Sequence, residues 1–120
     1  MPHFGEIVRA INLPDSEGRN PKPFRPCVVV TSDEDLAAGA PIVVLGISTL
    51  LPGRPHPTAV PLAWKDGGHP RTGLKKRCAV FVTWRVVVTP DRIISEGRTT
   101  SPLERLAIAE ALQKLDKGLI

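Results

Sequence analysis

Aromatic residues and long hydrophobic runs are scarce in this sequence of 120 residues. It has three Phe, two Trp and no Tyr, so few rings are available for stacking against a ligand. No apolar run approaches the ~18 residues that a membrane-spanning helix needs. The amino terminus also lacks the basic region followed by an apolar one that marks a secretory signal. We therefore expect a cytoplasmic protein with no membrane contact.

Cysteines are few as well, and the motifs of several enzyme classes are missing. Cys27 and Cys78 both lie in segments expected to be strands, and without an export signal we interpret them as buried thiols rather than a disulfide. The cysteines and histidines lack the paired spacing typical of a metal site. Phosphate-binding and dinucleotide-binding glycine motifs and a G-x-S-x-G elbow are also missing. We therefore expect neither a metal nor a cofactor.

Proline and glycine are abundant instead, with thirteen and ten copies, and most of them precede residue 71. Such a distribution is typical of short strands joined by irregular loops. The apolar fraction of 42% is enough for a packed core, and the length fits one domain over residues 1–120. These features predict a mainly β (α+β) fold, a small and partly open antiparallel barrel rather than a two-sheet sandwich.

Apolar and β-branched runs between turn residues predict five strands. They are roughly 5–11, 26–31, 41–47, 58–64 and 73–88. The last run is longer than a usual strand, so we expect it to bend or divide near Thr83 and Trp84. Residues 13–24 contain too many breakers for a regular element and are expected to form a loop. Residues 32–39 are expected to form one helical turn that begins at Ser32 or Asp33 and stops at Gly39.

The carboxy-terminal segment predicts an amphipathic helix over roughly residues 102–117. Ser101-Pro102-Leu103-Glu104 is a capping box with proline in the first helical position. Apolar residues then follow at helical spacing, with Gly118 as a plausible end. The predicted stripe consists of Ile108, Ala111, Leu112, Leu115 and Leu119. Leu103 and Leu106 lie off this stripe and would be either half-buried or packed on a partner subunit.

The strand predicted at 26–31 is preceded by Arg25, and the strand predicted at 41–47 is followed by Ser48 and Thr49. Antiparallel pairing would bring the start of the first strand beside the end of the second. Arg25, Ser48 and Thr49 could then share one pocket. A fixed guanidinium beside hydroxyl groups suits the binding of a phosphate.

Lys and Arg are concentrated between Leu51 and Pro90, where the only acidic residue is Asp66. This imbalance favours a polyanionic partner, although a solvated basic face is the alternative. Together with the 13–24 loop, the segment supplies the candidate RNA-binding residues. These are Arg19, Lys22, Arg54, His56, Arg71, Lys75, Lys76 and Arg77. His56 and His69 could serve as acid and base or be ordinary loop histidines.

RNA carries its own nucleophile, the 2′-OH, and its cleavage does not strictly require a metal. An arginine can bind two oxygens of the charged phosphorane at once, and Ser or Thr hydroxyls can donate short hydrogen bonds to it. Arginine remains protonated and is therefore a poor general base. Arg25, Ser48 and Thr49 are our candidate catalytic residues for such a reaction.

Several short segments, taken in order, resemble one protein family. Gly5-Glu6-Ile7-Val8 resembles its opening strand, residues 25–30 its R-P strand, and residues 43–49 its segment ending in a hydroxyl residue. Thr72-Gly73-Leu74 and the following Arg77-Cys78 resemble its later turn and strand. The ordered set resembles the PemK/MazF-like toxins of bacterial toxin–antitoxin systems over most of the chain.

This resemblance implies an SH3-like barrel that forms a homodimer and cleaves single-stranded RNA, mostly mRNA, as a metal-independent endoribonuclease. It also implies neutralisation by a cognate antitoxin with an acidic, disordered tail, with DNA contacted only through that antitoxin. Arg25 matches the catalytic arginine of the family, Ser48 its active-site threonine, and Arg77 a basic residue used by some members. The chain departs from the family pattern at residues 16–23, which lack the G-x-E-Q-x-G segment, and at Ala79, where some members are acidic.

Two alternatives remain open on the sequence. The first is a non-catalytic barrel that binds nucleic acid or a protein such as gyrase. The second is a degenerate toxin homologue whose only partner is an antitoxin-like peptide. Cleavage of RNA in EDTA separates both from the nuclease.

Overall fold

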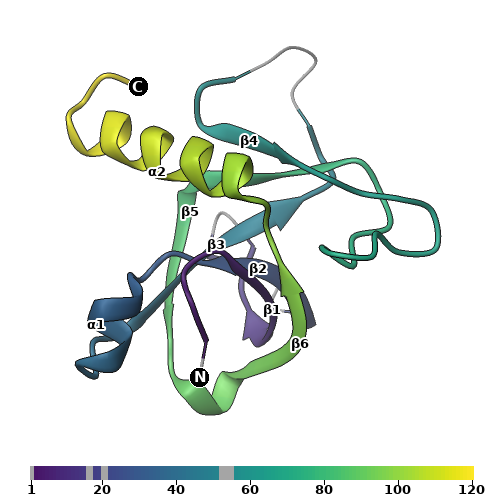
Figure 1. Cartoon of the computed structure of the whole chain (residues 1–120), viewed down its shortest axis with the longest axis horizontal. Helices are drawn as coiled ribbons and strands as arrows, with labels where there is room; N and C mark the ends of the chain where they lie inside the picture. The colour runs from purple at the N-terminus through teal and green to yellow at the C-terminus, as the bar shows by residue number, and fades with distance from the viewer. Residues whose placement is uncertain (1, 16–17, 20–21, 52–55) are drawn as a thin grey trace.

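The computed structural model describes residues 2–15, 18–19, 22–51 and 56–120, and Figure 1 shows how their elements are arranged. The order of elements along the chain is β1 (Glu6–Leu13), β2 (Lys22–Val29), α1 (Asp33–Ala37), β3 (Ile42–Ser48), β4 (Ala59–Leu62), β5 (Cys78–Val88), η1 (Pro90–Arg92), β6 (Ile93–Thr99) and α2 (Pro102–Asp116). Within these residues, no helix combines the length and the apolar character needed to span a bilayer.

The strands form one sheet in the order β4-β5-β3-β2-β1-β6, and every neighbouring pair is antiparallel. β5 and β6 are joined through η1 at the bottom of Figure 1, although β6 pairs with β1 and β5 with β3. Among the described residues the outer strands β4 and β6 do not pair with each other, so the sheet is curled but open. The carboxy-terminal helix α2 lies against β4 and β5. The predicted fold class is confirmed.

The sheet has buried side chains on both faces. One face, here called the helix face, carries Ile7, Val28 and Leu45 in a cluster that includes Ile108 of α2. The other, here called the tryptophan face, carries Cys27 in a cluster that includes Trp84; its other buried members include Val8, Ala10, Leu13, Val29 and Val44. Because successive side chains of a strand point to opposite faces, the unbroken apolar run of β2 supplies both clusters.

Most predicted elements are confirmed, with shifted ends. β1, β3 and β4 lie at the expected places, and α1 has Ser32 as its N-cap, with the Ser32 hydroxyl accepting a hydrogen bond from the Asp35 amide. Gly39 follows α1 with a φ of 82°, as expected for the residue that ends a helix. The last predicted strand begins at Cys78 rather than residue 73, because residues 73–77 form turns and loop.

Two predictions about strands were wrong. β2 begins at Lys22, inside the predicted loop of residues 13–24, despite prolines at 23 and 26. Its pairing with β3 covers only residues 27–29, so both prolines lie where β2 pairs with β1 alone. A proline has no backbone N–H to donate, and this is tolerated where a strand has a neighbour on one side only. The sequence prediction also missed β6, because an outer strand with an exposed, polar Ser95-Glu96-Gly97-Arg98 segment lacks a hydrophobic pattern.

Helix α2 is confirmed with its capping box, in which the Ser101 hydroxyl accepts from the Glu104 amide and the Glu104 carboxylate accepts from the Ser101 amide. Ile108 and Ala111 are buried, with Leu112 and Leu115 packed beside them. Leu119 is 68% exposed and does not belong to the buried stripe. It follows Gly118, whose φ of 72° has already ended the helix, so the helical spacing no longer applies to it.

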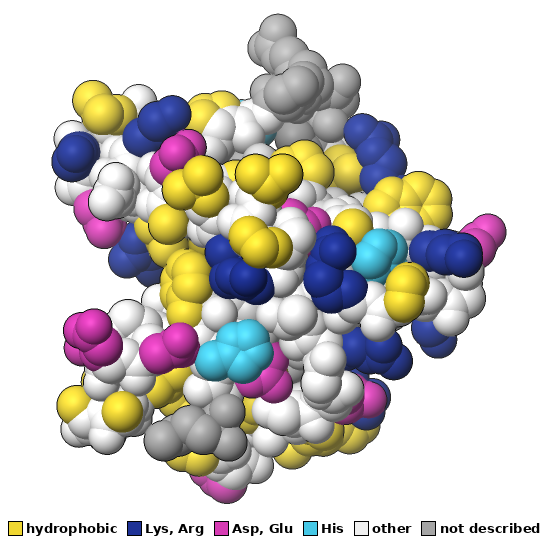
Figure 2. Space-filling view, viewed as in Figure 1, with side chains coloured by type: hydrophobic (Ala, Val, Ile, Leu, Met, Phe, Trp, Pro, Cys, Tyr) yellow, Lys and Arg dark blue, Asp and Glu magenta, His cyan; other side chains and the backbone are white. Residues whose placement is uncertain are grey.

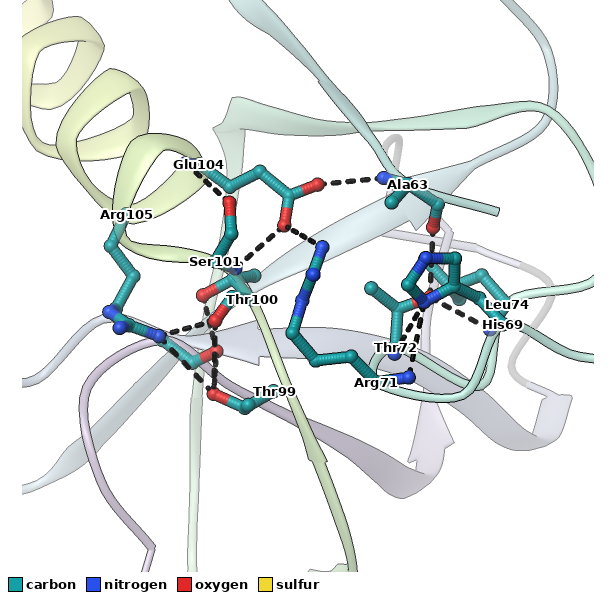
Figure 3. Close-up of polar contacts among 11 residues, drawn as sticks. Ala63, His69, Arg71, Thr72, Leu74, Thr99, Thr100, Ser101, Glu104 and Arg105 are labelled. Atoms are coloured by element: carbon teal, nitrogen blue, oxygen red, sulfur yellow. Dashed lines mark hydrogen bonds and ion pairs between the residues drawn. The ribbon is translucent and has the colours of Figure 1, made fainter. Parts of the chain in front are cut away.

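The Glu104 carboxylate joins α2 to the β4–β5 loop as well as capping its own helix (Figure 3). Its Oε2 accepts from the Ala63 amide at 2.7 Å, and its Oε1 accepts from Arg71 Nη2 at 3.2 Å and from the Ser101 amide at 2.7 Å. Burial works to raise the pKa of Glu104, but these hydrogen bonds and the Arg71 charge outweigh it and hold the pKa below its usual value. The carboxylate therefore fixes the position of the loop only while it is ionised.

Replacing Glu104 with glutamine is expected to lower the free energy of unfolding at pH 7 by about 1–3 kcal/mol, because hydrogen bonds to a charged acceptor are lost. A lowered folded pKa stabilises the protein above the unfolded pKa, near 4.5, and this contribution disappears as the pH falls through the folded pKa. Urea denaturation of wild type and Glu104→Gln should thus differ at pH 7 and converge in acid. Glu110→Gln, an exposed change on the same helix, is the matched control. An equal difference at both pH values would contradict the assignment.

Candidate functional site

Arg25 is held at the amino-terminal part of β2 on the tryptophan face. It pairs across the ladder with Ala10, which belongs to the cluster of that face. Arg25 Nε donates to the Leu13 carbonyl at 2.9 Å, and its guanidinium carbon lies 5.6 Å from the centroid of the Trp84 ring. The side chain is half-buried. A hydrogen bond at one edge and a ring beneath its plane therefore restrict the orientation of this cation.

Trp84 reaches this position because of an irregularity between β3 and β5. Leu45 pairs with Arg85 whereas Ile47 pairs with Val80, so residues 81–84 of β5 bulge opposite Gly46. A Cβ atom on Gly46 would lie 2.0 Å from the indole of Trp84. Only glycine at position 46 leaves room for the ring. Among the described residues, Trp84 Nε1 is buried without a hydrogen-bond partner.

Ser48 lies on the same face as Arg25. Cys27 pairs with Gly46, and continuing that antiparallel register by two residues sets Arg25 opposite Ser48, just beyond the end of the β2–β3 ladder. The Ser48 hydroxyl is half-exposed and accepts a hydrogen bond from the Leu50 amide at 3.0 Å. Its own proton remains available for donation to a ligand. The register thus places two of the three candidate catalytic residues on one face of the sheet, where the β2–β3 ladder ends.

Thr49 is on the other side of the sheet. It is exposed and lines an open cavity of about 500 Å³ on the helix face, together with Ile7, Val8, Arg9, Pro26, Ile47, Thr72, Gly73, Leu74, Lys75, Lys76, Cys78, Glu96 and Arg98. The alternation of side chains along β3 accounts for this separation, because Ile47 and Thr49 point away from the face that carries Gly46 and Ser48. Arg25 is not part of the lining of this cavity.

Lys75 and Lys76 line the cavity as well and are exposed, so two of the candidate RNA-binding residues accompany Thr49. Figure 2 shows Lys and Arg side chains gathered over the region of the β4–β5 loop, at the right of the view. Arg9, Glu96 and Arg98 complete the charged lining. These three residues were not among the candidates chosen from the sequence, because Arg9 has the pattern of an ordinary strand residue and β6 was not predicted.

Other candidate residues lie elsewhere. Arg71 pairs with Glu104, and His56 is an exposed turn residue whose Nδ1 accepts from the Thr58 amide at 3.2 Å. His69 similarly accepts from the Arg71 amide at 3.1 Å (Figure 3). Arg77 is exposed and follows the cavity-lining lysines, and Arg19 is exposed in the β1–β2 loop. Arg54 and the side chain of Lys22 fall outside the described residues.

Both cysteines are free and buried, as predicted. Burial raises the pKa of the Cys27 thiol to about 12. Burial, together with the Glu104 charge, raises the pKa of the Cys78 thiol to about 11. No group of three or more His, Cys, Asp and Glu side chains suited to a metal ion occurs in the described part of the chain. Neither thiol has the features of a nucleophile.

We expect both thiols of the native protein to react with a disulfide reagent at pH 8 at least about 10²-fold more slowly than a free cysteine, since the thiolate is the reacting form. The measurement is the release of the chromophoric thiol from the reagent, with the protein unfolded in guanidinium as the positive control. Cys78→Ala assigns the residual rate to one site. Rapid labelling of either thiol in the native protein would contradict the assigned burial.

The tryptophan-face site therefore consists of a positioned cation on an aromatic platform and a hydroxyl on the same face of the sheet. Such a pair can bind a phosphate through charge-assisted hydrogen bonds, with the guanidinium contacting two oxygens and the hydroxyl a third. It can also stabilise extra negative charge that develops on those oxygens. The cavity on the helix face is chemically different, since it combines a basic rim with an apolar floor.

An open, six-stranded antiparallel sheet with a carboxy-terminal helix is the fold of the MazF toxins, and this chain has it along its full length. An endoribonuclease from a Mycobacterial species, solved in complex with its cognate antitoxin, matches with a TM-score of 0.70 and 20% identity over 100% of this chain and 98% of that one. The Mycobacterium tuberculosis toxin MazF-mt6 matches with a TM-score of 0.68 and 18% identity, over 93% of this chain and 96% of that one. MazF of Deinococcus radiodurans matches with a TM-score of 0.69 and 13% identity, over 97% of this chain and 96% of that one. No family model matches the sequence, and no curated protein does.

Proposed function

We propose that this protein is the toxin of a toxin–antitoxin system and acts as a metal-independent endoribonuclease on single-stranded RNA, mainly mRNA. One observation carries the proposal. In a chain that has the fold of MazF toxins from end to end, the strand register puts Arg25 and Ser48 on the same face of the sheet.

In the proposed reaction the 2′-hydroxyl of the ribose gives up its proton to water and its oxygen attacks the adjacent phosphorus. The bond from phosphorus to the 5′ oxygen of the next nucleotide breaks, and that oxygen takes up a proton from water. The products are a 2′,3′-cyclic phosphate and a free 5′-hydroxyl. Arg25 binds two non-bridging oxygens, and Ser48 donates a hydrogen bond to the same group, so that both stabilise the charge of the transition state. The hydrogen bond to Leu13 and the contact with Trp84 keep the guanidinium oriented before the substrate arrives.

The proposed partners follow from the same assignment. The neighbour solved with its cognate antitoxin supports an antitoxin as the natural inhibitor, and we propose that DNA is contacted only through it. We propose further that the toxin is a cytoplasmic homodimer. The exposed Leu103 and Leu106 of α2, at 79% and 56% exposure, are apolar side chains available to a second subunit.

The decisive test is incubation of the purified protein with a long single-stranded RNA in EDTA, followed by mapping of the new ends. Discrete cuts that leave cyclic phosphate, lost on annealing the RNA to its complement, are expected. RNA that is bound but remains intact would instead indicate the non-catalytic binding module. RNA that is neither bound nor cut would indicate the degenerate homologue.

Ser48→Ala is expected to lower the cutting rate by about tenfold to 10²-fold, because one neutral donor to the transition state is removed. Ser48→Thr keeps the hydroxyl and is expected to retain most of the rate. Thr49→Ala is the matched comparison on the other face of the sheet. Single-turnover rates at saturating protein measure the chemical step for all three. A larger loss for Thr49→Ala than for Ser48→Ala would move the site to the helix-face cavity.

A further inference from the structure

Two arginines bind three successive carbonyls at the end of β1. Arg92 Nη2 donates to the Ile11 carbonyl at 2.9 Å and to the Asn12 carbonyl at 3.1 Å, and Arg92 Nε donates to the Ile11 carbonyl at 3.2 Å. The next carbonyl along the chain, that of Leu13, accepts from Arg25 Nε at 2.9 Å. The two guanidinium groups are therefore connected through one short backbone segment.

The backbone of β1 is irregular at Asn12, which lies between the two arginine contacts. Ala10 is buried on the tryptophan face, so regular alternation would place Asn12 on that face and Leu13 on the other. Leu13 is instead fully buried in the tryptophan-face cluster, and Asn12 is exposed with a φ of 55°. Asn12 is the only residue other than glycine with a positive φ in the described part of the chain. This left-handed residue thus turns Leu13 to the face that carries Arg25.

Arg92 stabilises the left-handed conformation. In a regular strand successive carbonyls point in opposite directions, so one donor could not reach two in a row. The Ile11 and Asn12 carbonyls both meet Arg92 Nη2 because the chain turns between them. Asparagine adopts this conformation more readily than most residues, but such a conformation persists only where the surrounding structure holds it. The half-buried Arg92 side chain supplies that support.

The corner that carries Arg92 is attached to both strands that contact the Arg25 side chain. η1 follows β5, the strand of Trp84, and leads into β6 (Figure 1). Ile93, directly after Arg92, pairs with Ala10 of β1, and Ala10 pairs with Arg25 of β2. The corner is therefore tied to β1 at Ala10, and Arg92 extends that attachment to the last residues of the strand.

We propose that Arg92 is a positioning residue for Arg25. It holds the turn at Asn12, the turn aims the Leu13 carbonyl at Arg25 Nε, and this hydrogen bond orients the guanidinium. Arg92 itself does not touch the substrate. The inference rests on the proposed function for its effect on RNA cutting. Misorientation of a group that acts in the transition state lowers the maximal rate more than it weakens substrate binding.

The first test measures the orientation of Arg25 without RNA. Its side-chain Nε–H, assigned by its absence in Arg25→Ala, gives an NMR signal whose exchange with water is slow while it donates to Leu13. We expect this exchange to be at least about tenfold faster in Arg92→Ala. Arg105→Ala is the matched control, since Arg105 also donates to a backbone carbonyl, that of Thr100, but at the start of α2. This control should leave the exchange unchanged.

The second test measures RNA cutting by variants that circular dichroism shows to be folded. Arg92→Ala is expected to lower the maximal single-turnover rate about tenfold, while the RNA concentration for the half-maximal rate changes by about twofold or less. Arg92→Lys is expected to retain the rate within about threefold, because an ammonium has three donors and can bind adjacent carbonyls. Arg105→Ala should cut at the wild-type rate.

Two changes at Asn12 separate the backbone conformation from the side chain. Asn12→Gly keeps the left-handed conformation accessible and should cut at the wild-type rate. Asn12→Val disfavours that conformation, because β-branched residues rarely have a positive φ, and should slow cutting about as much as Arg92→Ala. Asn12 is exposed, so neither change leaves a cavity. Asn12→Val combined with Arg92→Ala should slow cutting little more than either change alone, because both act on one turn.

The inference is overturned by equal exchange of the Arg25 Nε–H in wild type and Arg92→Ala, by wild-type cutting in folded Arg92→Ala, or by an equal loss in Arg105→Ala. Equal losses in Asn12→Gly and Asn12→Val would also overturn it, since the turn would then have no part in the effect. A wild-type protein that leaves RNA intact would remove the proposed function, and the exchange measurement alone would then decide whether Arg92 orients Arg25.

Discussion

Replacing Arg25 with alanine is expected to lower the rate of RNA cutting by about 10²–10³-fold, the usual loss when a donor to a developing oxyanion is removed. The guanidinium is half-buried between the Leu13 carbonyl and the Trp84 ring. The loss should appear in kcat rather than KM, because the interaction strengthens in the transition state. Single-turnover rates measured at increasing RNA concentration show whether the loss lies in the maximal rate or in the RNA concentration needed to reach half of it.

Arg25→Lys separates geometry from charge. Lysine keeps the positive charge but has no planar fork, so it cannot bond to Leu13, stack on Trp84 and bind two phosphate oxygens at once. We expect Arg25→Lys to lose most of the rate as well. Both variants should remain folded, since the hydrogen bond and the ring contact each contribute about 1 kcal/mol. Full activity of the lysine variant, or cutting by the alanine variant near the wild-type rate, would remove Arg25 from the reaction.

Local signals in the sequence were sufficient for the carboxy-terminal helix and for the buried strand that carries Arg25. The capping box at Ser101 and Glu104 determines where α2 begins without help from the rest of the fold, because its hydrogen bonds lie within four residues. The apolar run after Arg25 predicted a buried strand, and antiparallel pairing with the next strand predicted that Arg25 and Ser48 lie on the same face of the sheet. Inferences of this kind need only two facts: side chains alternate between the two faces along a strand, and the neighbouring strand runs antiparallel.

The rest of the site depends on contacts between distant segments that no local pattern contains. The side of the sheet on which Thr49 lies follows from the register of β3, which a sequence run does not fix to one residue. The cavity exists because the loop between β4 and β5 folds back, with Arg71 held by Glu104 and the Thr72 hydroxyl bound to the Ala63 carbonyl at 2.8 Å. Arg71 therefore appeared to be a ligand-binding cation in the sequence, whereas in the structure it holds the loop.

Gly46→Ala is expected to lower the free energy of unfolding by about 1–3 kcal/mol or more, as overpacking of a filled core does. In a strand this change would ordinarily be favourable, because glycine loses more backbone entropy on folding than alanine. Here the new Cβ would lie 2.0 Å from the Trp84 ring, so the indole or the strand must move. Urea denaturation monitored by circular dichroism measures the cost.

A double-mutant cycle with Trp84→Leu identifies the cause of that cost. Removing the indole should reduce the penalty of Gly46→Ala to about 0.5 kcal/mol or less, so that the two changes are strongly non-additive. An equal penalty in both backgrounds would place the effect in the backbone of β3 and not in the packing of the ring. Measuring the RNA-cutting rates of the same four proteins tests whether the packing of the indole affects the reaction. If the ring orients Arg25, then Gly46→Ala must slow the cutting of RNA by a folded protein, because displacing the indole removes the platform on which the guanidinium lies.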